Sequence, residues 1–150
     1  MGTSNNRYGS IRNLEKQRIE FQNRIDSKND IEYRRHEGQF STPFALAKEI
    51  TEYAIKLIDD NNISFLEPAV GTGAFISAFL DSMEKSSKKV TKILGIEKDA
   101  DFYEAATTLW GNECVINNDF FKEPANASYN LLICNHMYVI ITFPKSINSS

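Results

Sequence analysis

The chain has 150 residues, 41% of them hydrophobic and 25% charged, which is the balance of an ordinary soluble globular domain. No apolar run approaches the roughly 18 residues of a membrane span, and the polar N-terminus lacks the pattern of a secretory signal, so we expect a cytoplasmic protein without a membrane partner. The net charge of −3 argues weakly against a dedicated nucleic-acid binder. The charge is uneven, because residues 1–37 carry 8 basic and 6 acidic side chains and the remainder carries 9 and 14.

Residues 1–37 are predicted to form an N-terminal helical extension. The composition from Ile11 to Arg35 favours helix, but the apolar positions are only roughly periodic and the apolar face is thin. This pattern predicts a charged surface helix or a pair of such helices. A helix that faces DNA or a partner protein is the alternative, supported only by the basic run Arg34-Arg35-His36.

The next helix is predicted over residues 44–58. The segment Gly38-Gln39-Phe40-Ser41-Thr42-Pro43 interrupts the preceding helical pattern, and Pro43 suits the first helical position behind Thr42 as N-cap. Apolar residues then recur with helical spacing and predict one buried face, opposite a charged one. The predicted buried face consists of Leu46, Ile50, Tyr53, Ala54, Leu57 and Ile58.

A glycine loop follows the first predicted strand, residues 63–66. It reads Glu67-Pro68-Ala69-Val70-Gly71-Thr72-Gly73 and leads directly into a predicted helix over residues 74–85. The order strand, glycine loop and helix is typical of a ligand site at the carboxyl end of a parallel strand. A Gly-x-Gly pattern alone also fits a purely structural turn, and Ile76 occupies the position of the third glycine in the dinucleotide fingerprint.

Three further strands are predicted, and each ends in residues typical of a binding site. The strand over residues 90–96 runs into Glu97, an acid placed to accept hydrogen bonds from ribose hydroxyls, with an exposed strand-end acid as the alternative. A helix over 100–110 should begin behind Asp99 as N-cap. The strand over 114–116 leads to Asp119 and Phe120, and the apolar strand over 129–134 ends at Asn135. Parallel strands would bring these ends to one edge of the sheet.

Two of these segments resemble motifs of S-adenosylmethionine-dependent DNA methyltransferases that modify an exocyclic amino group. Residues 67–75 resemble their cofactor loop, with Glu67 where aspartate is more usual, and residues 38–43 resemble the motif that precedes this loop in the adenine-N6 group. The resemblance implies that Glu67 holds the cofactor's ammonium, that Asp119 accepts from its adenine amino group and that Phe120 packs on the ring. The implied cofactor residues are Phe40, Thr42, Glu67, Ala69, Gly71, Gly73, Phe75, Glu97, Asp119 and Phe120.

The catalytic motif departs from the family pattern. The family reads Asn-Pro-Pro-Tyr after the fourth strand, where the asparagine accepts from the amino group of a flipped-out base. This chain reads Asn135-His136-Met137-Tyr138, so the asparagine is retained and both prolines are absent. Without the prolines the turn is less rigid, and misplacing the acceptors by about 1 Å can cost on the order of 100-fold in rate.

Residues 136–150 are predicted to form an irregular tail, and we hypothesise that a frameshift after Asn135 produced it. A coding sequence for Pro-Tyr-Val-Arg-His-His and the codon that follows, read from its second base, can encode His-Met-Tyr-Val-Ile-Ile, which is residues 136–141. On this hypothesis the resemblance covers residues 38–135, the cofactor-binding core of the family, and lacks most of the target-binding half.

These observations predict an α/β fold: the Rossmann-like parallel sheet of a class I methyltransferase, truncated after the fourth strand and preceded by a helical segment. The resemblance implies the function of a restriction-modification adenine-N6 DNA methyltransferase with S-adenosylmethionine as cofactor and double-stranded DNA as partner. We expect this chain to be a truncated, inactive fragment of such an enzyme that binds the cofactor weakly in isolation. The alternatives are a non-catalytic partner subunit of a restriction-modification complex and a methyltransferase that acts on another substrate.

Overall fold

The computed structural model describes residues 10–37, 39–124 and 128–135. The predicted tail over 136–150 lies outside the described residues. Helices and strands alternate along most of the chain. The elements in order are α1 (Ile11–Lys28), α2 (Ile31–Glu37), α3 (Phe44–Lys56), β1 (Asn62–Glu67), α4 (Ala74–Glu84), β2 (Lys89–Glu97), α5 (Ala100–Trp110), β3 (Val115–Asn117), the 3₁₀ turn η1 (Phe120–Lys122) and β4 (Leu131–Leu132).

The four strands form one parallel sheet in the order β3-β2-β1-β4. The order reverses between β1 and β4, so the carboxyl end of β1 lies at the switch point where open α/β sheets bind ligands. The predicted α/β fold with a parallel Rossmann-like sheet is therefore confirmed. The predicted fourth strand was longer than the one observed, which spans only Leu131–Leu132.

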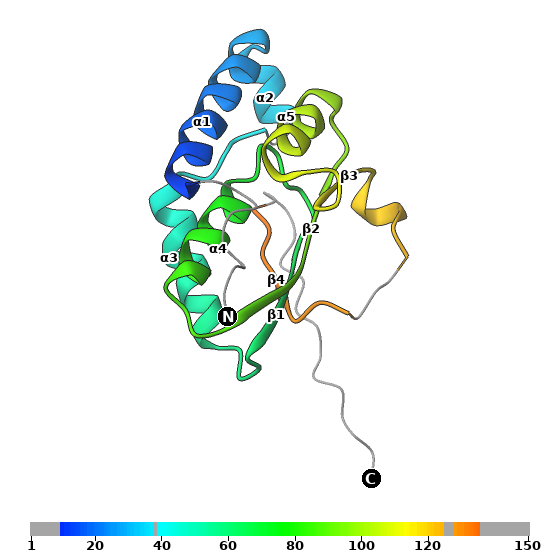
Figure 1. Ribbon diagram of the computed structural model, residues 1–150. Coiled ribbons are helices and arrows are strands. Elements are labelled where there is room, and N and C mark those ends of the chain that lie inside the picture. Colours follow the sequence, from blue (N-terminus) through cyan, green and yellow to red (C-terminus); the bar gives the residue numbers. More distant parts are fainter. Residues whose placement is uncertain (1–9, 38, 125–127, 136–150) are drawn as a thin grey trace.

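Helices α3, α4 and α5 lie over the same face of the sheet, and α1 lies across α4 and α5 (Figure 1). Right-handed crossovers place α4 and α5 on one face, because the chain steps in one direction from β1 through β2 to β3. The core forms between this face and the helices: Phe65 of β1 packs on Phe79 of α4 with ring centroids 4.8 Å apart. No helix among the described residues is long and apolar enough to cross a membrane.

Helix α1 is part of the core, which corrects the expectation of a solvated surface helix. Its apolar residues Ile11 and Ile25 are buried against the helices below, and so are the polar residues Glu15, Arg18 and Gln22. The apolar face of α1 is thin, and this pattern predicted a surface helix. Nothing in the sequence indicated that the charged residues Glu15 and Arg18 would be buried as a pair. Helix α2, in contrast, buries none of its residues.

The buried face of α3 was predicted only in part. Its buried residues are Ala47, Thr51 and Ile55. Of the predicted face, Ala54 and Ile58 are partly buried against the core, whereas the other four residues are exposed; Tyr53 retains 65% of its accessible surface. Small residues let α3 approach α4 closely, and the Thr51 hydroxyl donates to the carbonyl of Ala47 within the helix. Tertiary packing therefore overrides the hydrophobic pattern here.

The N-cap of α3 also differs from the prediction. Pro43 occupies the N-cap position, and no side chain caps the helix. The hydroxyl of Thr42 is instead turned toward the end of β4, where it accepts a hydrogen bond from the side chain of Asn135.

Alanine substitutions on the buried and the exposed face of α3 should change the free energy of unfolding by very different amounts. Ile55→Ala, at a residue that is 6% exposed, should lower the free energy of unfolding by about 3 kcal/mol, because it leaves a cavity in the core. Ile50→Ala, at a residue that is 39% exposed, should change it by less than about 0.5 kcal/mol. Urea denaturation measures both values, and similar losses in the two variants would show that the Ile50 face is covered.

Candidate functional site

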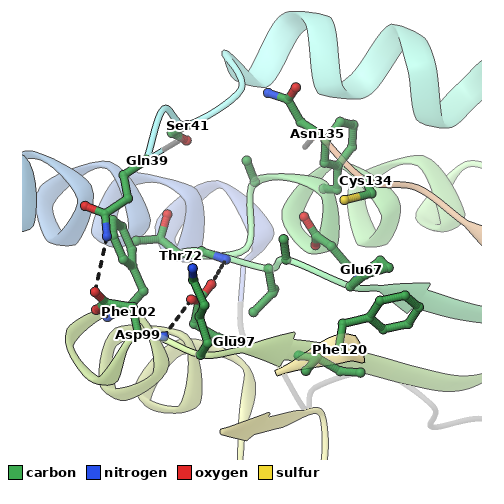
Figure 2. Close-up of a pocket in the computed structure, with 18 of the residues that line it drawn as sticks. Gln39, Ser41, Glu67, Thr72, Glu97, Asp99, Phe102, Phe120, Cys134 and Asn135 are labelled. Atoms are coloured by element: carbon green, nitrogen blue, oxygen red, sulfur yellow. Dashed lines mark hydrogen bonds between the residues drawn. The ribbon is translucent and has the colours of Figure 1, made fainter. Parts of the chain in front are cut away.

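A cavity of about 460 Å³ opens at the carboxyl ends of the strands (Figure 2). Its walls are the segment before α3, the loop between β1 and α4, the turn between β2 and α5, the turn after β3, and the end of β4. The volume lies within the range of roughly 300–1,000 Å³ that is usual for small-molecule sites. The position agrees with the switch-point rule for open parallel sheets.

Nearly every residue predicted for the site lines this cavity, including both ends of the predicted set, Phe40 and Asn135. The sheet brings together strand ends that are far apart in the sequence, as the prediction required. Their roles as ligands stay predictions. The predicted residues at the wall are Phe40, Thr42, Glu67, Ala69, Gly71, Phe75, Glu97, Asp119, Phe120 and Asn135.

Gly73 is the exception, because it does not line the cavity and instead lies against Trp110. Its φ of +90° is in the left-handed region, and a Cβ built there would lie 2.2 Å from Nε1 of Trp110. The indole Nε1 donates a hydrogen bond of 2.9 Å to the carbonyl of Thr72, inside the loop. Gly73 is therefore required for close packing of the loop on α5.

Glu67 is a buried carboxyl group at the end of β1, with 3% of its surface exposed. Its Oε2 has no hydrogen-bond partner among the described residues. Burial raises the pKa of Glu67 well above its usual range, and the nearby Glu97 carboxyl raises it further. The backbone amide of Ile76, which donates to this carboxyl group, and to a smaller extent Arg18 act in the opposite direction and favour the carboxylate. One oxygen of this buried carboxyl group, Oε2, thus lacks a donor among the described residues, and a cationic ligand would satisfy it.

Glu97 is fixed by backbone donors on both sides of the cavity wall. Its Oε2 accepts from the amide of Gly71 at 2.8 Å, and its Oε1 accepts from the amide of Asp99 at 2.9 Å (Figure 2). Burial raises the pKa of Glu97, and these amide donors counteract part of that effect. The carboxylate therefore joins the glycine loop to the turn after β2. These two hydrogen bonds also fix the direction in which its oxygens can accept further hydrogen bonds.

Asn135 and Thr42 meet at the cavity wall although they are far apart in the sequence. The Nδ2 of Asn135 donates to Oγ1 of Thr42 at 2.8 Å. This bond orients the side-chain amide of Asn135, whose acceptor atom is Oδ1. The other residues of the predicted catalytic motif, 136–138, lie outside the described residues.

Several lining residues were missed by the sequence analysis. Gln39 belongs to the motif that was recognised, and its Nε2 donates to Asp99 at 3.2 Å while its Oε1 is buried without a partner among the described residues. Asp99 was assigned only as the N-cap of α5, a role that the structure confirms. Phe102, in the first turn of α5, and Cys134, beside Asn135, gave no sequence signal.

Acidic residues predominate in the cavity wall. Among the described residues that line it, five carry carboxyl groups and one, Lys98, carries an ammonium group. Such a wall favours a ligand that carries positive charge and hydrogen-bond donors over one that carries phosphate groups. The carboxyl groups are those of Glu37, Glu67, Glu97, Asp99 and Asp119.

No protein-family model matches the chain. A solved structure from Listeria monocytogenes, described as a class I S-adenosylmethionine-dependent methyltransferase, is 19% identical with a TM-score of 0.60; the match covers 84% of this chain and 41% of that one. The plantazolicin methyltransferase BpumL, solved with a pentazolic desmethylPZN analog and SAH, is 19% identical with a TM-score of 0.48, covering 83% of this chain and 48% of that one.

The similarity to the Listeria structure shows that the chain has the fold of a class I methyltransferase. The chain spans less than half the length of either solved structure. The similarity therefore shows the fold of this chain and not what the chain binds or modifies.

Proposed function

We propose that the cavity binds S-adenosylmethionine and that the chain is the cofactor-binding part of an adenine-N6 DNA methyltransferase. The observation that carries the proposal is Glu67, a buried carboxyl group in the cavity wall whose Oε2 has no partner among the described residues. A buried acceptor costs free energy until a donor reaches it. The ammonium group of S-adenosylmethionine is a donor that also supplies the missing positive charge.

The remaining residues of the wall suit the rest of this cofactor. Glu97 would accept from the ribose hydroxyls, and Asp119 and Phe120 would hold the adenine by hydrogen bonding and packing. The acidic wall suits a ligand with ammonium and sulfonium charges and without phosphate. When bound, S-adenosylmethionine supplies an electrophilic methyl group.

Adenine as the target follows from the resemblance and from the position of Asn135. Its engaged nitrogen leaves Oδ1 to accept from an exocyclic amino group, which would orient that group and increase the electron density on its nitrogen. Base amino groups in duplex DNA reach such a site only when the nucleotide is flipped out. The proposed role of Asn135 is therefore to bind and orient the base.

Cofactor binding can be tested at Asp119, whose Oδ1 accepts from the amide of Phe121 at 3.0 Å. Asp119→Asn keeps this acceptor but replaces Oδ2 with a donor that opposes the adenine amino group. We expect affinity for S-adenosylmethionine to fall by about tenfold, the equivalent of one hydrogen bond, with little change in melting temperature. Isothermal titration calorimetry on concentrated protein is the measurement, because a sheet of four strands should bind weakly.

Asp101→Asn is the matched control, since Asp101 is exposed and pairs with Lys28 outside the cavity. It should leave the affinity unchanged. If folded wild-type protein gives no heat with the cofactor, the binding proposal fails. If binding is normal but Asp119→Asn has no effect, the assignment of the adenine subsite is wrong.

The target is tested by product analysis. Any label that the protein transfers from methyl-labelled cofactor to DNA should appear after hydrolysis in N6-methyladenine and not in N4-methylcytosine. The rate should be low because Asn135-His136-Met137-Tyr138 lacks the rigid prolines of the family motif. Label found only in protein would contradict DNA as the substrate.

A further inference from the structure

Arg18 lies in the middle of helix α1 with only 3% of its surface exposed. Its guanidinium forms a fork with Glu15, from Nε to Oε2 at 2.8 Å and from Nη2 to Oε1 at 2.7 Å. The hydroxyl of Ser77, on α4, donates to Oε2 of Glu15 at 2.6 Å. The ion pair is thus fixed against the helix that follows the glycine loop.

The other side of the guanidinium contacts the two segments that carry the recognised motifs. Nη1 donates to Oγ of Ser41 and to Oγ1 of Thr72, both at 3.1 Å. Ser41 precedes Thr42, which holds Asn135, and Thr72 lies between Gly71 and Gly73. Ser41 and Thr72 both line the cavity, whereas Arg18 does not.

Thr72 has almost no freedom of its own. Its hydroxyl accepts from Arg18 and donates to Oε1 of Gln22, also on α1, at 2.9 Å, and its carbonyl accepts from the indole of Trp110. The loop is therefore held between α1 and α5 by Arg18 and Trp110, which do not line the cavity, and by Gln22, which does. Nη1 of Arg18 is the atom that links the hydroxyl group of Ser41 to that of Thr72.

We propose that Arg18 is a positioning residue of the cavity, which holds the segment at Ser41–Thr42 and the loop at Gly71–Gly73 in register with each other. What the cavity binds rests on the proposed function, but the positioning does not. A buried ion pair contributes little net stability compared with apolar residues of the same volume, so stability alone gives no reason for it. Arginine suits the task because its planar fork can satisfy a carboxylate and still donate on another edge.

The test uses Glu15→Met/Arg18→Met, which removes both charges together. Removing Arg18 alone would leave a buried unpaired carboxylate and could unfold the protein, whereas apolar replacement of a whole pair is tolerated. We expect amide hydrogen exchange in residues 39–43 and 69–74 to accelerate about tenfold, the equivalent of one lost hydrogen bond, without cofactor present. Affinity for S-adenosylmethionine should fall by about the same factor.

Two controls separate positioning from general destabilisation. Arg12→Met, at an exposed position of α1, should change neither quantity. Ile55→Ala should lower the free energy of unfolding and so accelerate amide exchange through global unfolding. It should not accelerate exchange in the two segments specifically, and the cofactor affinity should stay within about twofold of wild type. If the double variant keeps wild-type exchange in both segments, Arg18 does not position them.

Failure of the two proposals can be distinguished. If folded wild-type protein does not bind the cofactor, the proposed function fails, while the exchange measurement still decides the role of Arg18. If the double variant shows faster exchange but unchanged cofactor affinity, the segments move without consequence for the site, and the positioning proposal is overturned.

Discussion

Gly73→Ala should be among the most damaging single substitutions in this chain, lowering the free energy of unfolding by about 4 kcal/mol. The new Cβ would lie 2.2 Å from Nε1 of Trp110, a side chain that is 1% exposed and has no room to move. Overpacking costs about 1–3 kcal/mol, the left-handed backbone about 1–2 kcal/mol, and the indole hydrogen bond to Thr72 would be strained as well. Urea denaturation, monitored by the fluorescence of Trp110, measures the change in the free energy of unfolding.

Gly71→Ala is the matched control, because Gly71 also has a positive φ, +55°, but a Cβ there would meet no atom within 4 Å. It should cost only about 1 kcal/mol. Trp110→Phe in the Gly73→Ala background should restore part of the stability by removing the crowded Nε1. Equal losses at Gly71 and Gly73, with no recovery from Trp110→Phe, would mean that backbone conformation and not packing against the indole sets the requirement.

The elements that could be predicted from the sequence are those whose signals are local. Asp99 is the N-cap of α5, as predicted, with its side chain accepting from the amides of Asp101 and Phe102. The glycine loop and the ends of the first three strands were placed within one residue because turn residues and short apolar runs determine them without reference to distant packing, whereas the fourth strand ends two residues earlier than predicted. Parallel order then brings the strand ends to one cavity by topology alone.

The failures concern faces of helices, which depend on partners elsewhere in the chain. The apolar residues of α3 cover a wide arc opposite its charged face, so periodicity could not tell that the small side chains of Ala47 and Thr51, at one edge of that arc, would form its contact with α4. On α1, nothing in the local sequence distinguishes the buried Arg18 from a solvent-exposed arginine. Two of those partners, Ser41 and Thr72, lie 23 and 54 positions further along the chain. Buried polar networks of this kind leave no periodic trace in a sequence.

Glu67→Gln should make the protein more stable at neutral pH and a weaker binder of its cofactor. In the folded protein the pKa of Glu67 lies well above its ordinary value of 4.5, because of burial and the neighbouring Glu97. Between these two pKa values the folded state retains a proton that the unfolded state releases, so the free energy of unfolding falls as pH rises. The substitution removes this pH dependence, and at pH 8 it should stabilise the protein by on the order of 1 kcal/mol.

The same substitution should reduce affinity for S-adenosylmethionine by about 10- to 100-fold, since a charge-assisted hydrogen bond to the ammonium is worth about 1.5–3 kcal/mol. Wild-type affinity should also rise with pH as Glu67 loses its proton, and the variant should lack that dependence. Thermal melts and calorimetric titrations between pH 5 and pH 8 give both quantities, with the exposed Glu84→Gln as control. A variant that is less stable at every pH would show that the carboxylate is satisfied in the folded chain. A carboxyl group that costs stability until its ligand arrives is a binding residue, and opposite changes in stability and affinity at Glu67 are the evidence for that role.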